Sequence, residues 1–352
     1  MRYRALGRTG IEVSEIGIGG IGPMGKYGPV AADGTSPTPS SGPSNTYREI
    51  PHFDVAPDGF ARTMSRAADL GVNLLDTAPS YGQSEEIFGH YLRDPAHRRQ
   101  WIVCTKTGVC GAMGDGDTLA PDDIAAQAKA SLRRLQIEQI DILLIHSIDQ
   151  YGHQEKAVEH VIDAGMVDAL ARLKETGIIR CYGVSGQLPE LIPAARTGLF
   201  DVTLAYATYN LLVRDAASEF LPLAVEQEIG VLLGGVFHSG LLAGDPACQS
   251  LTDLKRFFEV QDPGLEKSEV MVNCAHRLQQ FAGGRPQDLR QLGLRFALSN
   301  GAVSTIVSGI RSTDEIEENA AAIEAGPLSA EELDDLADVV DGFPDITWTY
   351  GH

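Results

Sequence analysis

The stretch Asn73-Leu-Leu-Asp-Thr-Ala-Pro-Ser-Tyr-Gly82 has the pattern that decides the fold. An apolar run ends in a carboxylate, Asp76, and a turn of small residues leads to a phenol, Tyr81, where a helix is expected to begin. α/β enzymes place their chemistry in such loops, at the carboxyl ends of parallel strands. The stretch therefore predicts a strand, a βα loop and one part of an active site.

Two other apolar runs also end in polar side chains. They are Ile102-Val-Cys-Thr-Lys106 and Ile140-Asp-Ile-Leu-Leu-Ile-His146. Side chains alternate along a strand, so Cys104 shares the face of Lys106, where we interpret it as a packing residue. If the three strands are neighbours, Asp76, Lys106 and His146 meet at one end of the sheet.

Strand-like and helix-like runs alternate along the rest of the chain. We expect strands over residues 15–22, 74–76, 102–106, 140–146, 178–185, 202–205, 231–234 and 303–308. We expect helices over residues 60–70, 85–92, 121–135, 164–176, 217–227, 269–282, 287–299 and 313–324, and one that begins at Pro189. Eight strand–helix units with short connections predict an α/β fold, the (β/α)8 TIM barrel.

Both ends of the chain add to this barrel. Residues 2–15 predict an N-terminal β-hairpin. Residues 330–340 predict an extra C-terminal helix, because Ser329 precedes them with Glu332 at capping-box spacing. We interpret residues 1–352 as a single barrel domain.

A doubly wound open sheet is the alternative fold. Gly17, Gly19 and Gly22 match the G-x-G-x-x-G pattern of dinucleotide-binding folds. That fingerprint requires a helix that starts at the glycines, and Pro23 with the glycines and proline that follow excludes one. The glycines instead indicate a tight exit from the first barrel strand.

Residues 23–57 are rich in Gly, Pro and Ser and predict a long loop after the first strand. A loop of this length is typical of a lid or a binding loop, and the carboxyl end of a barrel strand is where such a lid would lie. An insertion without function fits the composition equally well.

The composition excludes several classes of partner. The chain has 28 basic and 48 acidic residues and a formal charge of −20, which disfavours nucleic acid and anionic membrane surfaces. The N-terminus lacks the apolar run of a signal peptide, and no run approaches the ~20 apolar residues of a membrane span. Five widely spaced cysteines indicate free thiols, with no disulfide framework and no metal site. We therefore expect a cytoplasmic protein, either a monomer or a homo-oligomer.

The polar residues at the strand ends suit proton transfer. A phenol has a pKa of about 10, and a neighbouring cation such as Lys106 would lower the pKa of Tyr81. Asp76 would keep the lysine charged, and His146 would orient an oxygen atom or relay a proton. Each residue alone has an ordinary structural explanation, but perturbed groups gathered in one cleft indicate function. Hydride would have to come from a cofactor, because no side chain donates one.

The motifs and their order resemble the aldo-keto reductase superfamily. The matching pieces span nearly the whole chain: residues 76–82 with Ser84-Glu85, Cys104-Thr-Lys106, residues 137–146, Gly183-Val-Ser185, and Gly309-Ile-Arg-Ser312 with Glu318-Asn319. Residues 235–243 are similar to the branch that oxidises free sugars such as L-fucose, L-galactose or D-threo-aldoses at C1 to lactones.

The resemblance implies an NAD(P)-dependent oxidoreductase that transfers hydride between nicotinamide and a sugar or a small aldehyde or ketone. It implies that Tyr81 is the acid/base, Lys106 its activator, Asp76 the partner of the lysine and His146 the substrate-orienting group. It also implies that NADP or NAD is bound by Ser185, Tyr206, Gly235, Val236, Phe237, Ser239, Gly240, Leu242, Ser308, Gly309, Arg311, Glu315, Glu318 and Asn319.

The sequence departs from the family pattern at the predicted cofactor site. Tyr206 occupies a position where many members have Gln, which removes the expected carboxamide contact but allows a ring to stack under the nicotinamide. Arg311 favours the 2′-phosphate of NADP, whereas Glu315, where Gln or Arg is usual, would repel it. The two signals leave the choice between NAD and NADP open.

Three alternative functions compete with sugar oxidation. One is an NADPH-dependent reductase of a bulkier keto-sugar or natural product. The second is a Schiff-base aldolase that uses Lys106 as its nucleophile. The third is a non-catalytic subunit that binds the cofactor, as the ion-channel accessory subunits of this superfamily are thought to do.

Overall fold

The computed structural model describes residues 1–20, 57–108, 121–148, 156–243, 266–284, 286–310 and 312–344. Two predictions fall outside these ranges: the loop at 23–57 except its last residue, and Arg311. The side chain of Ser239 is also outside the description.

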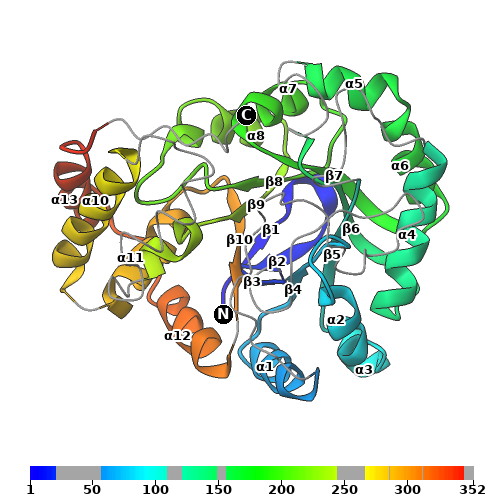
Figure 1. The fold of residues 1–352 in the computed structure, drawn as a ribbon, viewed down its shortest axis with the longest axis horizontal. Coiled ribbons are helices and arrows are strands. Elements are labelled where there is room, and N and C mark those ends of the chain that lie inside the picture. The colour runs from blue at the N-terminus through cyan, green and yellow to red at the C-terminus, as the bar shows by residue number, and fades with distance from the viewer. Residues whose placement is uncertain are drawn as a thin grey trace.

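Eight parallel strands of the described chain form a closed barrel (Figure 1). Their order around the barrel is β10-β3-β4-β5-β6-β7-β8-β9, so the last strand closes against the first. The strands are β3 (Ile16–Gly19), β4 (Leu74–Asp76), β5 (Ile102–Thr107), β6 (Ile140–Ile145), β7 (Ile179–Gly186), β8 (Val202–Tyr206), β9 (Gly230–Gly234) and β10 (Val303–Gly309). The predicted α/β barrel is therefore confirmed.

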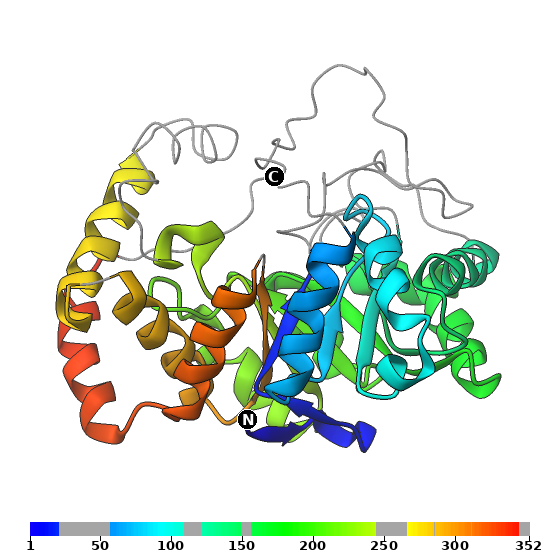
Figure 2. The same ribbon diagram turned by 90° about the horizontal axis from the view of Figure 1, so that it is seen from below.

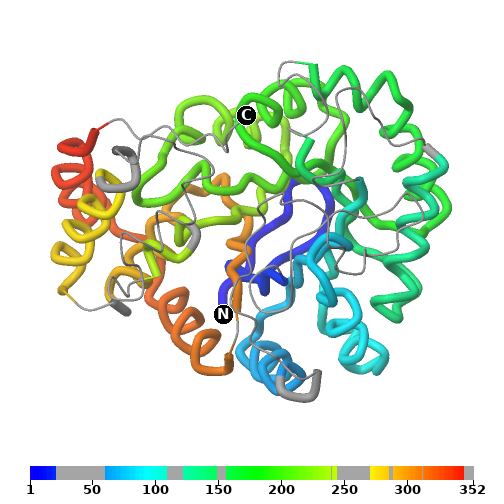
Figure 3. Tube along the Cα trace, in the orientation of Figure 1, coloured from blue at the N-terminus to red at the C-terminus, as the bar shows by residue number. Residues whose placement is uncertain are grey.

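Helices surround the barrel, and the tube in Figure 3 follows them from the blue N-terminal strands to the orange β10, which returns to β3. They are α1 (Pro57–Asp69), α2 (Ser84–Leu92), α3 (Pro95–Arg98), α4 (Pro121–Leu135), α5 (Ala157–Asp163), α6 (Met166–Glu175), α7 (Leu188–Arg196), α8 (Phe220–Glu226), α10 (Glu266–Ala282), α11 (Pro286–Ser299), α12 (Thr313–Glu324) and α13 (Ala330–Val340). Short 3-10 helices are η1 (Gly7–Thr9), η4 (Asp215–Ala217) and η5 (His238–Ala243).

Apolar side chains fill the interior of the barrel. The strands contribute Leu74, Cys104, Ile142, Leu144, Cys181, Val202, Leu204, Leu232 and Val307. Cys104 is fully buried in this cluster, on the face that Lys106 shares, as the strand alternation predicts. Asp76 is in register with Cys104, so the polar ends of β4 and β5 lie above the same packed core.

The N-terminal hairpin closes the lower end of the barrel, where the strands begin. Strands β1 (Tyr3–Ala5) and β2 (Glu12–Ser14) pair antiparallel, as predicted. In Figure 2 the blue hairpin lies beneath the barrel strands. Leu6, Ile11 and Val13 are buried and belong to the same apolar cluster as the barrel interior. The hairpin therefore acts as an apolar plug.

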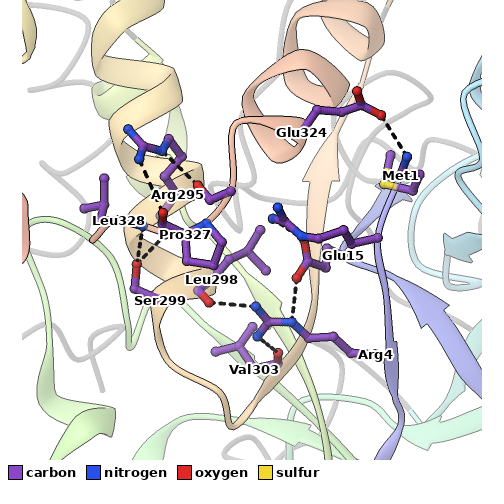
Figure 4. A network of polar contacts seen from close by, with 12 residues as sticks. Met1, Arg4, Glu15, Arg295, Leu298, Ser299, Val303, Glu324, Pro327 and Leu328 are labelled. Carbon is purple, nitrogen blue, oxygen red and sulfur yellow. Dashed lines mark hydrogen bonds and ion pairs between the residues drawn. The ribbon is translucent and has the colours of Figure 1, made fainter. Parts of the chain in front are cut away.

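Arg4 and Glu15 fix this hairpin to the end of α11 and the start of β10 (Figure 4). Arg4 Nε donates to Glu15 Oε1 at 2.7 Å, and its other nitrogens donate to the carbonyls of Leu298, Asn300 and Val303. Arg2 forms a second ion pair with Glu15 at 2.6 Å. The buried carboxylate thus has two cations, and the hairpin is tied to the segment between α11 and β10.

The structure corrects several predicted boundaries. The predicted helix over 164–176 begins at Met166, because Gly165 has a left-handed φ of 73° that separates it from α5. The first barrel strand is Ile16–Gly19, and residues 21–22 of the predicted 15–22 lie outside the described residues. The last helix is as predicted, and both capping-box bonds between Ser329 and Glu332 are present.

Candidate active site

Asp76 and Lys106 form a buried ion pair at the upper end of the barrel, where the strands end. Lys106 Nζ donates to both carboxylate oxygens of Asp76, at 2.6 and 2.8 Å, and to the carbonyl of Thr77 at 2.8 Å. The lysine side chain is 1% exposed. A desolvated ammonium needs such acceptors, and here all three of its N–H donors are directed at oxygen atoms.

Tyr81 lies against this lysine. Lys106 Nζ is 4.7 Å from the centroid of the tyrosine ring. The turn that carries Tyr81 is fixed by a bond from its N–H to the carbonyl of Ala78 at 3.0 Å and by a 2.7 Å contact between the hydroxyls of Thr77 and Ser84. The cation is therefore placed beside the phenol that the sequence predicts as the acid/base.

His146 completes the cluster from the end of β6. Its backbone N–H donates to the carbonyl of Thr107 at 2.8 Å. Its ring lies edge-on to Tyr81, with centroids 5.5 Å apart and an interplanar angle of 78°. The hydroxyl of Ser80 is 3.3 Å from His146 Nδ1. The four predicted residues are thus brought together by β4, the following turn, β5 and β6.

The buried groups have shifted pKa values. Burial lowers the pKa of Lys106, but the opposing effects of Asp76, Tyr81 and Cys104 are together larger, so the net shift is upward. Burial, with a further contribution from the charge of Lys106, holds the pKa of His146 well below its ordinary value. Burial and the charge of Asp76 raise the pKa of the Cys104 thiol. At neutral pH the cluster therefore holds a charged lysine, a neutral imidazole and a neutral thiol.

Ser185, a predicted cofactor contact, supports the turn after His146. Ser147 has a positive φ of 47°, a conformation that costs non-glycine residues of order 1 kcal/mol. Its N–H donates to Ser185 Oγ at 2.8 Å, and this bond offsets the strain. Ser185 is buried at the end of β7, so its hydroxyl helps to position the segment that carries His146.

Tyr206 and the segment after β9 lie beside each other. Tyr206 is in register with Gly234. Gly235 has a φ of 70°, and a Cβ there would approach Ala207 N to 2.7 Å, so only glycine fits. In the predicted cofactor-binding run, Val236 and Leu242 are buried in the core, whereas Phe237 and Gly240 are partly exposed.

Asn210 holds the 3-10 helix η5 of this segment. Its Oδ1 accepts bonds from Leu212 and Val213 N–H, and its Nδ2 lies 3.4 Å from both the Gly235 carbonyl and His238 Nδ1. Burial lowers the pKa of His238 to about 4. His238 lies within the predicted cofactor-binding run of residues 235–243, whereas the sequence predicts no role for Asn210.

The start of α12 carries features that fit a bound nucleotide. Ser308 Oγ is buried at the end of β10 and has no hydrogen-bond partner among the described residues. Ser312 caps α12 by accepting from Glu315 N–H at 3.2 Å, and a helix start attracts phosphate. Glu318 is already paired with Arg290, and Asn319 is buried. Gly309 ends β10 and is exposed. The unused hydroxyl and the helix start are consistent with the predicted cofactor site.

The described residues contain no group of three or more His, Cys, Asp or Glu side chains placed to hold a metal ion. No helix in the described parts of the chain combines the length and apolar character needed to cross a membrane.

The fold defines a class: a (β/α)8-barrel protein, with the candidate active site at the carboxyl ends of the strands. The model of the Aldo/keto reductase family matches residues 52–341. The chain belongs to this family, whose members are NAD(P)-dependent oxidoreductases.

Several curated proteins are similar along most of the chain. L-galactose dehydrogenase of Arabidopsis thaliana is 29% identical and covers 100% of this chain and 98% of its own length. Pyridoxal 4-dehydrogenase of Microbacterium luteolum is 26% identical over 90% of this chain and 91% of its own length. A probable voltage-gated potassium channel subunit beta of Oryza sativa is 26% identical over 99% of this chain and all of its own length.

A solved structure supports the fold. The holo form of an aldo-keto reductase from Bacillus halodurans matches with a TM-score of 0.64, at 24% identity and over 96% of both chains.

Proposed function

We propose that this protein oxidises an aldose at C1 to a lactone, with transfer of hydride to NAD or NADP and with Tyr81 as the acid/base. The observation that carries the proposal is the buried Asp76–Lys106 pair beside Tyr81, with Lys106 Nζ 4.7 Å from the ring centroid. A fixed cation favours the phenolate form of tyrosine, which is the form that accepts a proton from a hydroxyl group.

The named relatives support a sugar as the substrate. Besides L-galactose dehydrogenase, a D-threo-aldose 1-dehydrogenase of a Pseudomonas species is 29% identical over 51% of this chain and 60% of its own length. Both names describe dehydrogenases of aldose sugars. Oxidation of a small aldehyde or ketone by the same residues is the broader form of the proposal.

The cofactor supplies a hydride acceptor, and the chain supplies the proton transfer and the orientation. His146 is neutral and is held edge-on to Tyr81, where it orients the oxygen atom of the substrate. Ser308, with the start of α12, provides the polar groups for the nucleotide. Tyr206 takes the place next to the nicotinamide ring in this proposal.

The geometry of Lys106 weighs against a Schiff-base aldolase. An aldolase lysine attacks as a neutral amine. Lys106 donates to three oxygen atoms and has a raised pKa, so its lone pair is not available at neutral pH. The lysine is placed to act on Tyr81.

The test is a substrate panel with the wild-type protein. Aldoses, keto-sugars and pyridoxal-like aldehydes are assayed in both directions by nicotinamide absorbance, with NAD and with NADP because Arg311 and Glu315 favour different nucleotides. We expect oxidation of at least one aldose. Strong reduction of bulkier carbonyl compounds without any sugar oxidation would contradict the proposal and favour the reductase alternative.

Tyr81→Phe distinguishes an enzyme from a non-catalytic subunit. We expect turnover to fall by roughly 10²–10⁴-fold, the usual contribution of general acid–base catalysis, with cofactor binding retained in a fluorescence titration. Tyr182→Phe is the matched control, because Tyr182 also lies beside a lysine, with Lys174 Nζ 5.4 Å from its ring centroid, but outside the cluster. Absence of turnover in the wild type, with cofactor bound, would favour the subunit that the potassium-channel relatives suggest.

A further inference from the structure

Ser80 is a buried hydroxyl whose contact with His146 the proposed function does not yet use. It lies in the turn after β4, immediately before Tyr81, and is 2% exposed. Its Oγ is 3.3 Å from His146 Nδ1, and both groups are buried. A neutral imidazole has one protonated and one unprotonated nitrogen, so the direction of this bond decides which nitrogen carries the proton.

The number of protons available to Ser80 and His146 decides which of the two groups donates this hydrogen bond. If Nδ1 were protonated, it would donate to Ser80, and the serine proton would need another acceptor. Among the described residues, Nδ1 is the acceptor that the hydroxyl reaches. A buried donor without a partner costs about 1–3 kcal/mol. The arrangement in which the hydroxyl donates to an unprotonated Nδ1 satisfies both groups.

We propose that Ser80 is a positioning residue, which donates to His146 Nδ1 and thereby places the imidazole proton on Nε2. The backbone at His146 is held by the bond from its N–H to the Thr107 carbonyl, and the ring lies edge-on to Tyr81. The contact with Ser80 adds a donor at Nδ1, which sets the position of the imidazole proton.

The effect of this tautomer on catalysis rests on the proposed function. With the proton on Nε2, His146 is a hydrogen-bond donor to the substrate oxygen in both reaction directions. In oxidation, the hydroxyl proton passes to Tyr81 while His146 keeps its proton, and a bound nicotinamide would accept the hydride from C1. In reduction, Tyr81 returns the proton to oxygen. Tyr81 is then the one group that exchanges a proton with substrate.

The first test reads the tautomer directly and needs no activity. Protein labelled with ¹⁵N-histidine is examined by NMR at neutral pH, and the His146 signals among the nine histidines are assigned with His146→Gln. We expect Nδ1 to have the shift of an unprotonated, accepting nitrogen and Nε2 that of a protonated one. A protonated Nδ1 in the wild type would overturn the proposal.

The second test removes the hydroxyl. We expect Ser80→Ala to give a mixture of the two tautomers and to lower kcat/KM by roughly 5–10-fold, the effect of one neutral hydrogen bond. Ser80→Thr keeps a hydroxyl, and we expect it to restore the single tautomer. Ser131→Ala is the control, because Ser131 is a buried serine on α4 that contacts Arg134 and lies outside the cluster.

The outcomes separate the two proposals. An unchanged tautomer in Ser80→Ala contradicts the role of Ser80, whatever the activity. A tautomer that shifts in Ser80→Ala and returns in Ser80→Thr supports it, even if the wild type oxidises no sugar, in which case the proposed function alone fails.

Discussion

The two ends of the barrel each bury a carboxylate beside a cation, but the cations differ. At the lower end Glu15, 3% exposed, is paired with Arg2 and Arg4, and Arg4 also donates to three carbonyls. At the upper end Asp76, also 3% exposed, is paired with Lys106, whose charge lies beside the Tyr81 ring. The lower cation ties segments together, whereas the upper one lies beside a group that can ionise and, in the proposed function, activates it.

The difference follows from the chemistry of the two side chains. Arginine has five N–H donors in a rigid plane and stays charged, so it suits a permanent junction of several backbone segments. Lysine is a compact charge whose effect is concentrated at one point. The comparison predicts that variants at the upper end change catalysis and pH response, and that variants at the lower end change stability alone.

The largest effect is expected at the upper ion pair. Lys106→Met should lower turnover by roughly 10²–10⁴-fold, because Tyr81 loses its cation. It should also lower the free energy of unfolding by about 3–5 kcal/mol, because Asp76 stays buried without a partner. Steady-state kinetics and urea unfolding measure the two effects.

A double variant separates the two consequences. Asp76→Asn with Lys106→Met removes both charges, so we expect much of the stability to return while turnover stays low. Recovery of turnover in the double variant would show that the cation is not needed by Tyr81.

The second largest effect is expected from two buried histidines at the upper end, which make the folded protein less stable in acid. Burial lowers the pKa of His238 to about 4 and holds that of His146 well below its ordinary value. The unfolded chain binds these protons near pH 6.5, and the folded chain does not, so stability is full above that pH and falls as the pH drops toward 4. For His238 this amounts to about 3 kcal/mol, at ~1.4 kcal/mol per pKa unit.

The acid effect is measured by urea unfolding at several pH values between 7 and 4. In His238→Gln, the free energy of unfolding should fall less steeply with decreasing pH than it does in the wild type. An equal slope in both proteins would mean that His238 is not the group that resists protonation.

The third effect is expected at the lower ion pair. Arg4→Met should lower the free energy of unfolding by about 2–3 kcal/mol, because several carbonyls and one side of Glu15 lose a charged donor. Glu15 keeps Arg2, so the loss should be smaller than for Lys106→Met. Activity per folded molecule should stay unchanged, and a decrease in kcat would contradict the division between the two ends.

The smallest effect is expected at the capping box of α13. Ser329 Oγ accepts from Glu332 N–H at 3.1 Å, so Ser329→Ala should cost about 1 kcal/mol of stability with no change in turnover. Ser329→Asp keeps an accepting side chain and is the matched variant. Thermal unfolding measures the difference between the two proteins.

Much of the upper end could be predicted because its signals are local. Asp76, Lys106 and His146 each follow an apolar run, and parallel strands bring such ends together. The α13 cap was visible because Ser329 and Glu332 are three residues apart. The roles of the four predicted catalytic residues stay predictions, since the geometry shows their contacts and the kinetics have to show their function.

Other contacts could not be predicted because they join distant residues. Arg4 bonds to the carbonyl of Val303, 299 positions away, and nothing in the local sequence at Arg4 indicates this partner. The contact of Ser80 with His146 depends on how the turn after β4 is oriented, which spacing does not specify. The short helix α3 was missed although Asp94 and Pro95 give a normal helix start, because four residues show no periodicity.

The barrel closes when β10 pairs with β3, so it cannot close during synthesis until β10 has been made. The four residues of the candidate active site lie within the first 146 positions, yet β3 pairs with Ser308 and its neighbours near the end of the chain. At ~5–20 residues per second, β10 leaves the ribosome roughly 15–60 s after β3. Throughout that time β3 has β4 on one side and an unpaired edge on the other, so the nascent chain can pair wrongly with other strands until β10 arrives.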